Sequence, residues 1–412
     1  MPPAPAMPRD ADVLVIGAGP AGSATAILLA YAGWRVVIAE QHEFPRRKVC
    51  GECIAAGNLS LLDQLGIGPA FREVAGPELR QVGWMGATST IMADLPACED
   101  GPYRYGRALG RDRLDTLLLG RARALGVSVL QPAKVRQVRG SAGHFQCEIS
   151  TGQGQPSRTL DTLIVVDARG SWEPGAGSIR PTPCASDLFG FKANFVETSL
   201  AAGVLPVLSL NGAYGGIVTA DRGLTTLACC IRRDALQRCR QNAPLTTAGA
   251  AVDAFLRRSC GGIRDVLRHA RLDGPWLAVG PLRPGIRVCS EPGRFRVGNA
   301  AGEAHPLIGE GISMALQSAL LLAHELTRQP PVMIDANRAD ALQRAYVARW
   351  RQAFESRMRL AAAFAQVAMH PLLARPAESM LRCWPSLLTR AARYAGKARR
   401  AVTPIMSTEE AL

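Results

Sequence analysis

The sequence predicts an α/β protein in which a doubly wound, Rossmann-type unit is interleaved with an antiparallel β-sheet and followed by a helical C-terminal region. Three observations predict it. A strand, a glycine-rich turn, a helix and a second strand follow one another over residues 12–40. A second glycine-rich segment at 298–311 leads into a long amphipathic helix. Short strand-like runs with turn signals lie between the two segments.

Composition limits the class of protein. The 412 residues are 48% hydrophobic and 20% charged, which is enough apolar material for large packed cores and excludes a disordered chain. No run approaches the ~18 uncharged apolar residues of a membrane span, so a transmembrane protein is excluded. Residues 1–10 are proline-rich and lack the apolar core of a signal peptide. We therefore expect a cytoplasmic protein whose 11 cysteines are thiols.

The net charge of +14 comes almost entirely from arginines scattered along the chain. Aromatic residues make up only 5% of the sequence, which is unlike a nucleic-acid-binding surface and favours an ordinary solvated basic surface. In the C-terminal part, arginines alternate with apolar residues. This pattern is also typical of helices at an anionic membrane surface, so peripheral membrane contact through these basic helices stays open as an alternative.

The N-terminal segment carries the pattern of a dinucleotide-binding unit. The β-branched run 12–16 is followed at once by Gly17-Ala18-Gly19-Pro20-Ala21-Gly22, a G-x-G-x-x-G motif. Its glycines allow a tight turn, a close approach of backbone to a pyrophosphate, and packing of the helix on the strand. The helix that follows directs free N–H groups at phosphate oxygens.

An acidic residue ends the second strand of this unit. Glu40, which is followed by Gln41, stands eighteen residues beyond Gly22, where a carboxylate can accept both ribose hydroxyls of an adenosine. The same carboxylate would repel a 2′-phosphate. The dinucleotide is therefore expected to be FAD or NAD rather than NADP.

A later segment decides between FAD and NAD. Residues 298–312 read GNAAGEAHPLIGEGI. This segment resembles the second flavin signature of p-hydroxybenzoate hydroxylase-like flavoproteins, and most closely that of their geranylgeranyl reductase branch. The resemblance implies bound FAD, with Asn299, in place of the usual Asp, at the ribityl chain and the loop from Pro306 beside the isoalloxazine ring. The contacts that it implies are Gly298, Asn299, Pro306, Gly309, Glu310, Gly311 and Ile312.

Further motifs resemble the same branch. Residues 44–52 read FPRRKVCGE, similar to its P-R-x-K-x-C-G-E loop, which implies that Lys48, Cys50 and Gly51 lie beside the cofactor. Arg111 begins a match to R-x-x-L-D, whose arginine reaches the pyrophosphate, and the Val135 backbone is implied to lie near adenine. One element departs from the family: Arg169 stands where the hydroxylases have an acid in their D-G motif, which weakens any transfer of their nicotinamide handling.

The resemblance implies a discontinuous domain organisation. The FAD-binding domain is expected over 1–75, 106–180 and 281–325, and a substrate domain over 76–105 and 181–280. Within the latter, 212–218 and 224–231 are predicted to form a hairpin around Asp221-Arg222-Gly223. A C-terminal helical region is expected over 326–412, with breaks at Pro371, Pro376 and Pro385.

Three residues are candidates for catalysis. His305 lies between the flavin strand and the loop at the ring, where an imidazole can donate a proton or hydrogen-bond a carbonyl. Tyr214, in a glycine-rich hairpin, contacts substrate or fills a sheet position. Cys50 is interpreted mainly as a packing group beside the ring. Its C-x-x-C spacing to Cys53 leaves a redox dithiol open, and no metal site is expected.

We therefore expect an FAD-dependent oxidoreductase that acts on a hydrophobic small molecule. The favoured reaction is hydroxylation of an aromatic or polyketide-like secondary metabolite by a flavin hydroperoxide. A reductase of prenyl double bonds is the main alternative, and a non-catalytic FAD-binding protein is another. A flavin halogenase is disfavoured because no tryptophan stands in a W-x-W-x-I-P motif. The expected electron donor is NADH or NADPH bound transiently, or a separate reductase.

Overall fold

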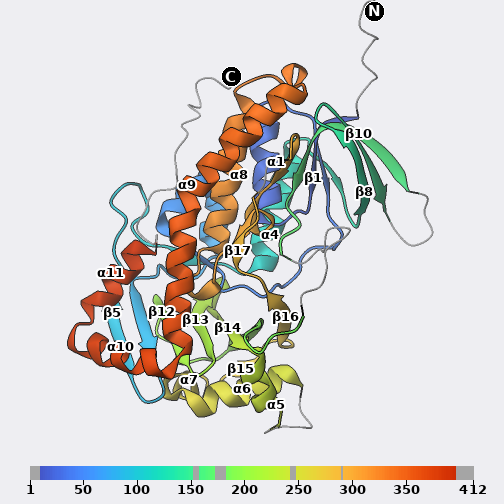
Figure 1. Cartoon of the computed structure of the whole chain (residues 1–412). Helices are drawn as coiled ribbons and strands as arrows, with labels where there is room; N and C mark the ends of the chain where they lie inside the picture. Colours follow the sequence, from blue (N-terminus) through green and yellow to red (C-terminus); the bar gives the residue numbers. More distant parts are fainter. Residues whose placement is uncertain (1–9, 152–156, 172–181, 242–246, 289–290, 396–412) are drawn as a thin grey trace, which may run out of the picture.

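The computed structural model describes residues 10–151, 157–171, 182–241, 247–288 and 291–395. They form two large sheets, joined along one side by a long C-terminal helix (Figure 1), and two small sheets of two strands each. In this part of the chain, no helix is long and apolar enough to cross a membrane.

The first sheet is mixed and is built around a completely buried central strand, β1 (Ala11–Ile16). β1 pairs in parallel with β2 (Val36–Ala39) and with β10 (Arg158–Asp167), as expected for a Rossmann-type crossover. The strand order is β7-β2-β1-β10-β9-β8, and β18 pairs in parallel with β10. The other strands are β7 (Ser128–Leu130), β8 (Lys134–Ser141), β9 (His144–Ser150) and β18 (Arg294–Arg296).

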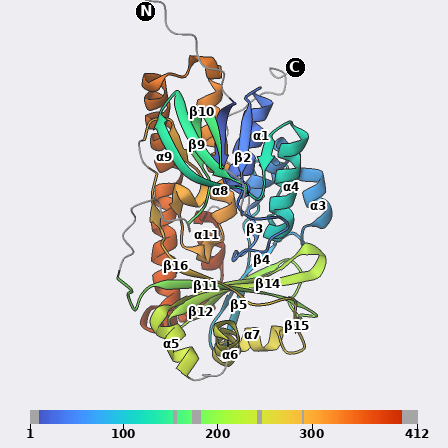
Figure 2. The same cartoon turned by 90° about the vertical axis from the view of Figure 1, so that its right-hand side faces the viewer.

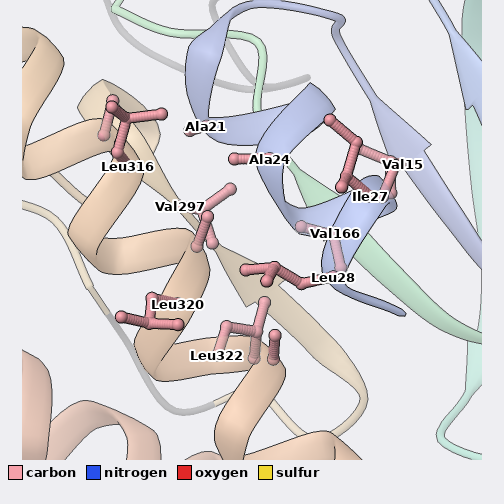
Figure 3. Close-up of a cluster of buried hydrophobic side chains, with 14 of the residues drawn as sticks. Val15, Ala21, Ala24, Ile27, Leu28, Val166, Val297, Leu316, Leu320 and Leu322 are labelled. Carbon is pink, nitrogen blue, oxygen red and sulfur yellow. The ribbon is translucent and has the colours of Figure 1, made fainter. Parts of the chain in front are cut away.

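Three helices cover one face of this sheet, namely α1 (Pro20–Tyr31), α4 (Arg111–Ala124) and α8 (Gly311–Thr327). α1 and α8 are packed side by side, and Figure 3 shows Ala24 and Leu28 of α1 in one cluster with Leu316 and Leu320 of α8. α1 is apolar on nearly every side because it is enclosed by strands and helices. Burial of each leucine in this cluster stabilises the fold by about 1.5–3 kcal/mol.

The second sheet has the order β15-β11-β14-β13-β12-β4-β5, with β16 paired to β11. The predicted hairpin is confirmed, since β13 and β14 are antiparallel neighbours joined by a short turn at 221–223. One pair differs from the expected antiparallel arrangement: β12 and β4 are parallel. The reason is that they belong to separate excursions of the chain from the first sheet. The strands are β4 (Gln81–Met85), β5 (Thr90–Asp94), β11 (Leu188–Val196), β12 (Val204–Leu210), β13 (Ala213–Ala220), β14 (Leu224–Arg232), β15 (Arg271–Leu272) and β16 (Leu277–Leu282).

One face of the second sheet packs on α5 (Arg233–Gln241), α6 (Ala248–Ser259) and α7 (Gly261–Val266), which lie beneath it in Figure 2. The other face is turned toward the first sheet. The remaining elements are β3 (Cys53–Ile54), η1 (Ala56–Asn58), α2 (Leu59–Gln64), α3 (Gly68–Val74), β6 (Arg107–Ala108), η2 (Asp221–Gly223), β17 (Gly285–Ile286), η3 (Gly298–Ala300), β19 (Gly302–Glu303), η4 (Pro306–Ile308) and η5 (Pro331–Met333).

Three helices make up the described C-terminal region. α9 (Ala336–Met369) runs along both sheets, and α10 (Pro371–Cys383) and α11 (Ser386–Tyr394) fold back at the edge of the second sheet (Figure 1). Breaks at Pro371 and Pro385 are confirmed, but the predicted break at Pro376 is wrong, because this proline lies inside α10. It stands in the second turn of a short helix, where its ring removes a single backbone hydrogen bond. Residues 396–412 lie outside the described part.

Candidate functional site

A cavity of about 1170 Å³ lies between the two sheets. It exceeds the ~300–1,000 Å³ usual for one small ligand, so a dinucleotide and a second molecule can share it. It extends from the glycine turn after β1, past the loop at 46–53, to the inner sides of α10 and α11. Most of the predicted site residues line its wall. They are Gly17, Gly19, Pro20, Ala21, Glu40, Gln41, Lys48, Cys50, Gly51, Arg111, Val135, Tyr214, Gly298, Asn299, Pro306, Gly309, Gly311 and Ile312.

Three predicted residues stand outside that wall: Gly22, His305 and Glu310. Gly22 lies directly behind the turn, where an added Cβ would come within 1.9 Å of the Gly17 carbonyl oxygen. Glu310 is buried and forms an ion pair with Arg357 of α9, so its side chain holds the start of α8 in place. These two residues therefore shape the site through packing.

The turn between β1 and α1 has the form that binding of a phosphate requires. Gly17 has a φ of 101°, a conformation that favours glycine. Its N–H donates to the Ala39 carbonyl at 2.8 Å, which ties the turn to the end of β2. Gly19 precedes Pro20, the first residue of α1, so the free N–H groups of the helix point toward the cavity.

Glu40 lines the cavity beside this turn. Its Oε2 accepts the Ala18 N–H at 2.8 Å, and its Oε1 accepts the His42 N–H at 2.9 Å. Each carboxylate oxygen keeps a second lone pair for a hydroxyl. The predicted contact with an adenosine ribose is thus sterically open and stays a prediction.

Three cationic side chains converge next to the turn. The Arg111 Nη2 would be 3.5 Å from a Cβ added at Gly19, so the guanidinium faces the glycines. A bidentate pair with Asp115 orients it, with both N–O distances at 2.7 Å. Burial by itself lowers the pKa of Arg111, but the Asp115 carboxylate outweighs burial and raises it.

Lys48 and Arg46 complete this basic group. Burial, together with the nearby charges of Arg111 and Arg46, lowers the pKa of Lys48 to about 8. Burial also lowers the pKa of Arg46, and its Nε has no hydrogen-bond partner among the described residues. Clustered, half-buried cations with an orphaned donor at a helix N-terminus fit a dianionic pyrophosphate. The residues present therefore fit FAD at this end of the cavity.

The wall next to the start of α1 is built from the segment after β18, since a Cβ added at Gly298 would lie 2.8 Å from the Ala21 Cβ. Gly298 has a φ of 59° and donates its N–H to the Ser318 Oγ at 2.8 Å, which joins η3 to α8. The Asn299 Nδ2 donates to the Ser171 Oγ at 3.0 Å. The expected contact of its Oδ1 with a ribityl hydroxyl stays a prediction. Arg169 also lines the cavity, and its Nη2 lies 2.7 Å from the Asp167 carboxylate.

Tyr214 of β13 and His305 of this segment lie next to each other. The Tyr214 Oη and the His305 Nδ1 are 3.3 Å apart, and only Tyr214 lines the cavity. Burial raises the pKa of Tyr214 well above its usual value, and burial lowers the pKa of His305. A protonated phenol therefore stands against a neutral imidazole at neutral pH, an arrangement that can hold or pass a proton.

The loop at 50–53 brings Cys50, Gly51 and Cys53 to the wall, and both cysteines are thiols. The Glu52 N–H donates to the Cys50 Sγ at 3.3 Å. Glu52 itself has a φ of 60°, and its carboxylate forms a buried ion pair with Lys192 of β11. This pair anchors the loop to the second sheet.

Sequence reasoning missed Arg46, Glu303 and the partnership of Glu52 with Lys192. Arg46 stands within the recognised loop, and its basic side chain beside Lys48 was a usable signal. Glu303 lines the cavity and is 5% exposed, and burial raises its pKa. Nothing in the sequence distinguished Lys192, because its partner lies 140 residues away.

The far part of the cavity is lined by apolar side chains, and we call it the apolar arm. It lies between the second sheet and the C-terminal helices. Its walls come from Val82, Trp84, Leu95, Leu205, Pro206, Val207, Val218, Phe364, Val367, Leu373, Pro376, Ala377, Met380, Leu381, Leu387, Leu388, Ala391, Ala392 and Ala395. Such a lining suits a hydrophobic ligand.

Comparisons with known proteins agree with the cofactor. Residues 10–179 match the model of the family described as FAD binding domain. Menaquinone reductase of Mycobacterium tuberculosis is 27% identical over 77% of this chain and 76% of its own length. Rifampicin monooxygenase of Rhodococcus hoagii is 24% identical over 77% of this chain and 64% of its own length.

Solved structures share the fold. The myxobacterial chondrochloren halogenase has a TM-score of 0.74 at 19% identity and covers 97% of this chain and 99% of its own. The p-nitrophenol 4-monooxygenase of Pseudomonas putida has a TM-score of 0.73 at 18% identity, with 96% and 100% covered. A geranylgeranyl bacteriochlorophyll reductase-like protein of Thermoplasma acidophilum has a TM-score of 0.67 at 18% identity, with 87% of each chain covered.

Proposed function

We propose that this chain is an FAD-dependent oxidoreductase of the monooxygenase-type flavoproteins, since residues 10–179 match the FAD binding domain family, and that it hydroxylates a hydrophobic aromatic or polyketide-like metabolite. Bound and reduced, the isoalloxazine ring supplies electrons to molecular oxygen or to a substrate double bond. The residues of this chain determine which of these two electron acceptors reaches the isoalloxazine ring.

One observation carries the proposal. On three adjacent strands of the second sheet, the cavity wall includes positions with little or no side chain, namely Gly190, Gly216 and Ala228. A broad surface with few side chains accommodates a flat aromatic substrate ring better than it packs around a thin hydrocarbon chain.

Tyr214 is assigned the role of contacting the substrate. Tyr214 lines the cavity, and the His305 Nδ1 next to its Oη can accept or return the phenolic proton. A substrate hydroxyl or carbonyl placed at the Tyr214 Oη would be held and polarised there. Cys50, on the loop opposite, packs against the ring position and narrows access for water.

A second candidate is reduction of prenyl double bonds. It is favoured by the 27% identity with menaquinone reductase and by the apolar arm, which provides room for a long hydrocarbon chain. Halogenation stays disfavoured because the sequence lacks a W-x-W-x-I-P motif, although halogenases share the fold. In each case the proposed electron donor is NADH or NADPH bound transiently, or a separate reductase. Because the proposed substrate is lipid-soluble, the proposal also includes peripheral membrane contact through the basic C-terminal helices.

Mass spectrometry under ¹⁸O₂ tests the reaction. The FAD-loaded protein is incubated with NADH or NADPH, chloride, and a panel of phenols, aromatic polyketides and prenylated quinones dispersed in detergent. Hydroxylation predicts a product that carries one ¹⁸O atom. A product that gains two hydrogens and no ¹⁸O would replace hydroxylation by the second candidate, and a chlorinated product would overturn both.

A further inference from the structure

The outer face of α10 and α11 is unusually apolar for a surface. Of the nine large hydrophobic side chains that are exposed in the described chain, five lie on these helices or directly after α10. Leu373, Met380 and Trp384 follow one another at spacings of seven and four residues, which places them along one side of α10. The five are Leu372 (89% exposed), Leu373 (48%), Met380 (47%), Trp384 (61%) and Tyr394 (67%). We call this set the apolar face.

The same helices carry a positive charge. Arg375, Arg382, Arg390 and Arg393 are exposed, whereas Glu378 is the one acidic residue of the two helices and is already paired with Arg382 at 2.9 Å. Exposed apolar residues with an aromatic pair and surrounding arginines are the composition of helices that lie in the headgroup region of anionic membranes. A protein interface would favour fewer unpaired cations around its apolar core.

The apolar face is continuous with the cavity. Leu373 and Met380 are about half exposed and also line the apolar arm, so they stand at a mouth between the outer surface and the interior. Behind them, Ala377 and Leu381 lead toward the second sheet. The helices lie at the edge of the molecule, on the side of the sheet away from α5 (Figure 1).

We propose that α10 and α11 dock on an anionic lipid bilayer and that the apolar arm opens into it between Leu373 and Met380. A lipid-soluble substrate then moves from the bilayer to the flavin without crossing water, which avoids the cost of hydrating its apolar surface. This inference rests on the proposed function in one respect only, the hydrophobic substrate. To the membrane contact of the proposed function it adds the docking face, the charge of the lipids and the route by which the substrate enters.

Vesicle sedimentation tests the docking. The full-length, FAD-loaded protein is mixed with large vesicles of phosphatidylcholine, with or without phosphatidylglycerol. We expect binding to the anionic vesicles, much weaker binding to neutral ones, and release at high salt. Each arginine near an anionic surface contributes about 1 kcal/mol, so Arg390→Gln with Arg393→Gln should weaken binding roughly 25-fold.

A second pair of substitutions tests the apolar contribution. Leu372→Ser with Trp384→Ser changes the apolar face at positions that do not line the cavity, and vesicle binding should fall at least tenfold. The matched control is Val332→Ser with Met333→Ser on η5, where both side chains are exposed (81% and 56%) but lie apart from α10 and α11 in the sequence. This control should bind vesicles like the unchanged protein.

Failure of the docking and failure of the proposed function give different results. Turnover of substrate dispersed in detergent should be unchanged in the Leu372→Ser, Trp384→Ser variant, whereas turnover of substrate embedded in vesicles should fall with binding. Equal vesicle binding by all variants, or none by the unchanged protein, would overturn the docking and leave the ¹⁸O₂ assay unaffected. A dimer in light scattering that dissociates in this variant would instead show that a second copy covers the face.

Discussion

Lys192 and Glu52 form an ion pair in which both side chains are completely buried. The Glu52 carboxylate also accepts the Thr226 hydroxyl and the N–H of Arg111 at the start of α4. One carboxylate therefore joins the loop of Cys50 to two strands of the second sheet and to the helix that carries Arg111, which is expected to reach the pyrophosphate. The position of the loop beside the flavin site depends on this junction.

Removal of one partner should be far more damaging than removal of both charges. Lys192→Met leaves a carboxylate buried without its cation, and we expect it to lower the free energy of unfolding by about 3–5 kcal/mol. The double variant Glu52→Gln, Lys192→Met should recover part of that loss, because no isolated charge remains. Urea unfolding measures both values.

An exposed ion pair supplies the comparison. Arg271→Met breaks the pair with Glu197, in which the side chains are 71% and 57% exposed, and should cost less than about 1 kcal/mol. If Lys192→Met cost no more than this variant, the buried pair would not hold the loop.

The Gly22 position should tolerate no side chain. In Gly22→Ala the new Cβ meets the Gly17 carbonyl oxygen at 1.9 Å, so the turn or α1 must move. We expect a loss of about 1–3 kcal/mol of stability and a large loss of FAD affinity, measured by thermal unfolding and by flavin fluorescence.

Gly120→Ala is the matched control. Gly120 lies in the exposed interior of α4, and nothing lies within 4 Å of an added Cβ. Because alanine favours the helix, this variant should gain up to about 1 kcal/mol and bind FAD normally. Similar FAD binding by both variants would refute the role of the turn.

Arg111 should contribute to FAD binding through the geometry of its guanidinium. Arg111→Lys keeps the charge near Asp115 but loses the planar fork, so FAD affinity should fall roughly tenfold while the melting temperature changes little. Arg123→Lys, at an exposed position near the end of the same helix, is the control. An unchanged dissociation constant for Arg111→Lys, measured by calorimetry, would remove Arg111 from the site.

The affinity for FAD should depend on pH through Lys48. Its pKa of about 8 means that the ammonium is present below pH 8 and is lost as the pH rises through that value. An anionic pyrophosphate binds the charged form, so affinity should be constant below pH 8 and fall by at most roughly tenfold per pH unit above it. In Lys48→Met the affinity should be lower throughout and should lose this dependence. A slope that persists in Lys48→Met would assign the titration to another group.

Local sequence patterns were enough to predict those parts of the site whose structure depends on residues adjacent in the chain. The glycine turn, α1, the strand before Glu40 and the hairpin of β13 and β14 follow from backbone sterics and from periodicities within a few residues. The resemblance of 298–312 to a flavin signature then added the cofactor. The same reliance on local patterns led to the wrong prediction of a helix break at Pro376. A proline normally breaks a helix, and only the packed structure shows where one is tolerated.

The sequence by itself therefore determined the type of fold of this protein and predicted the segments that bind FAD. Only the tertiary structure decided that Arg46 is left with an orphaned donor, that Glu303 is buried, that Lys192 pairs with Glu52, and that α10 and α11 cover the mouth of an apolar arm. These features arise where segments more than a hundred residues apart come together. Their energies depend on desolvation and charge at that meeting point, which no local pattern of residues encodes.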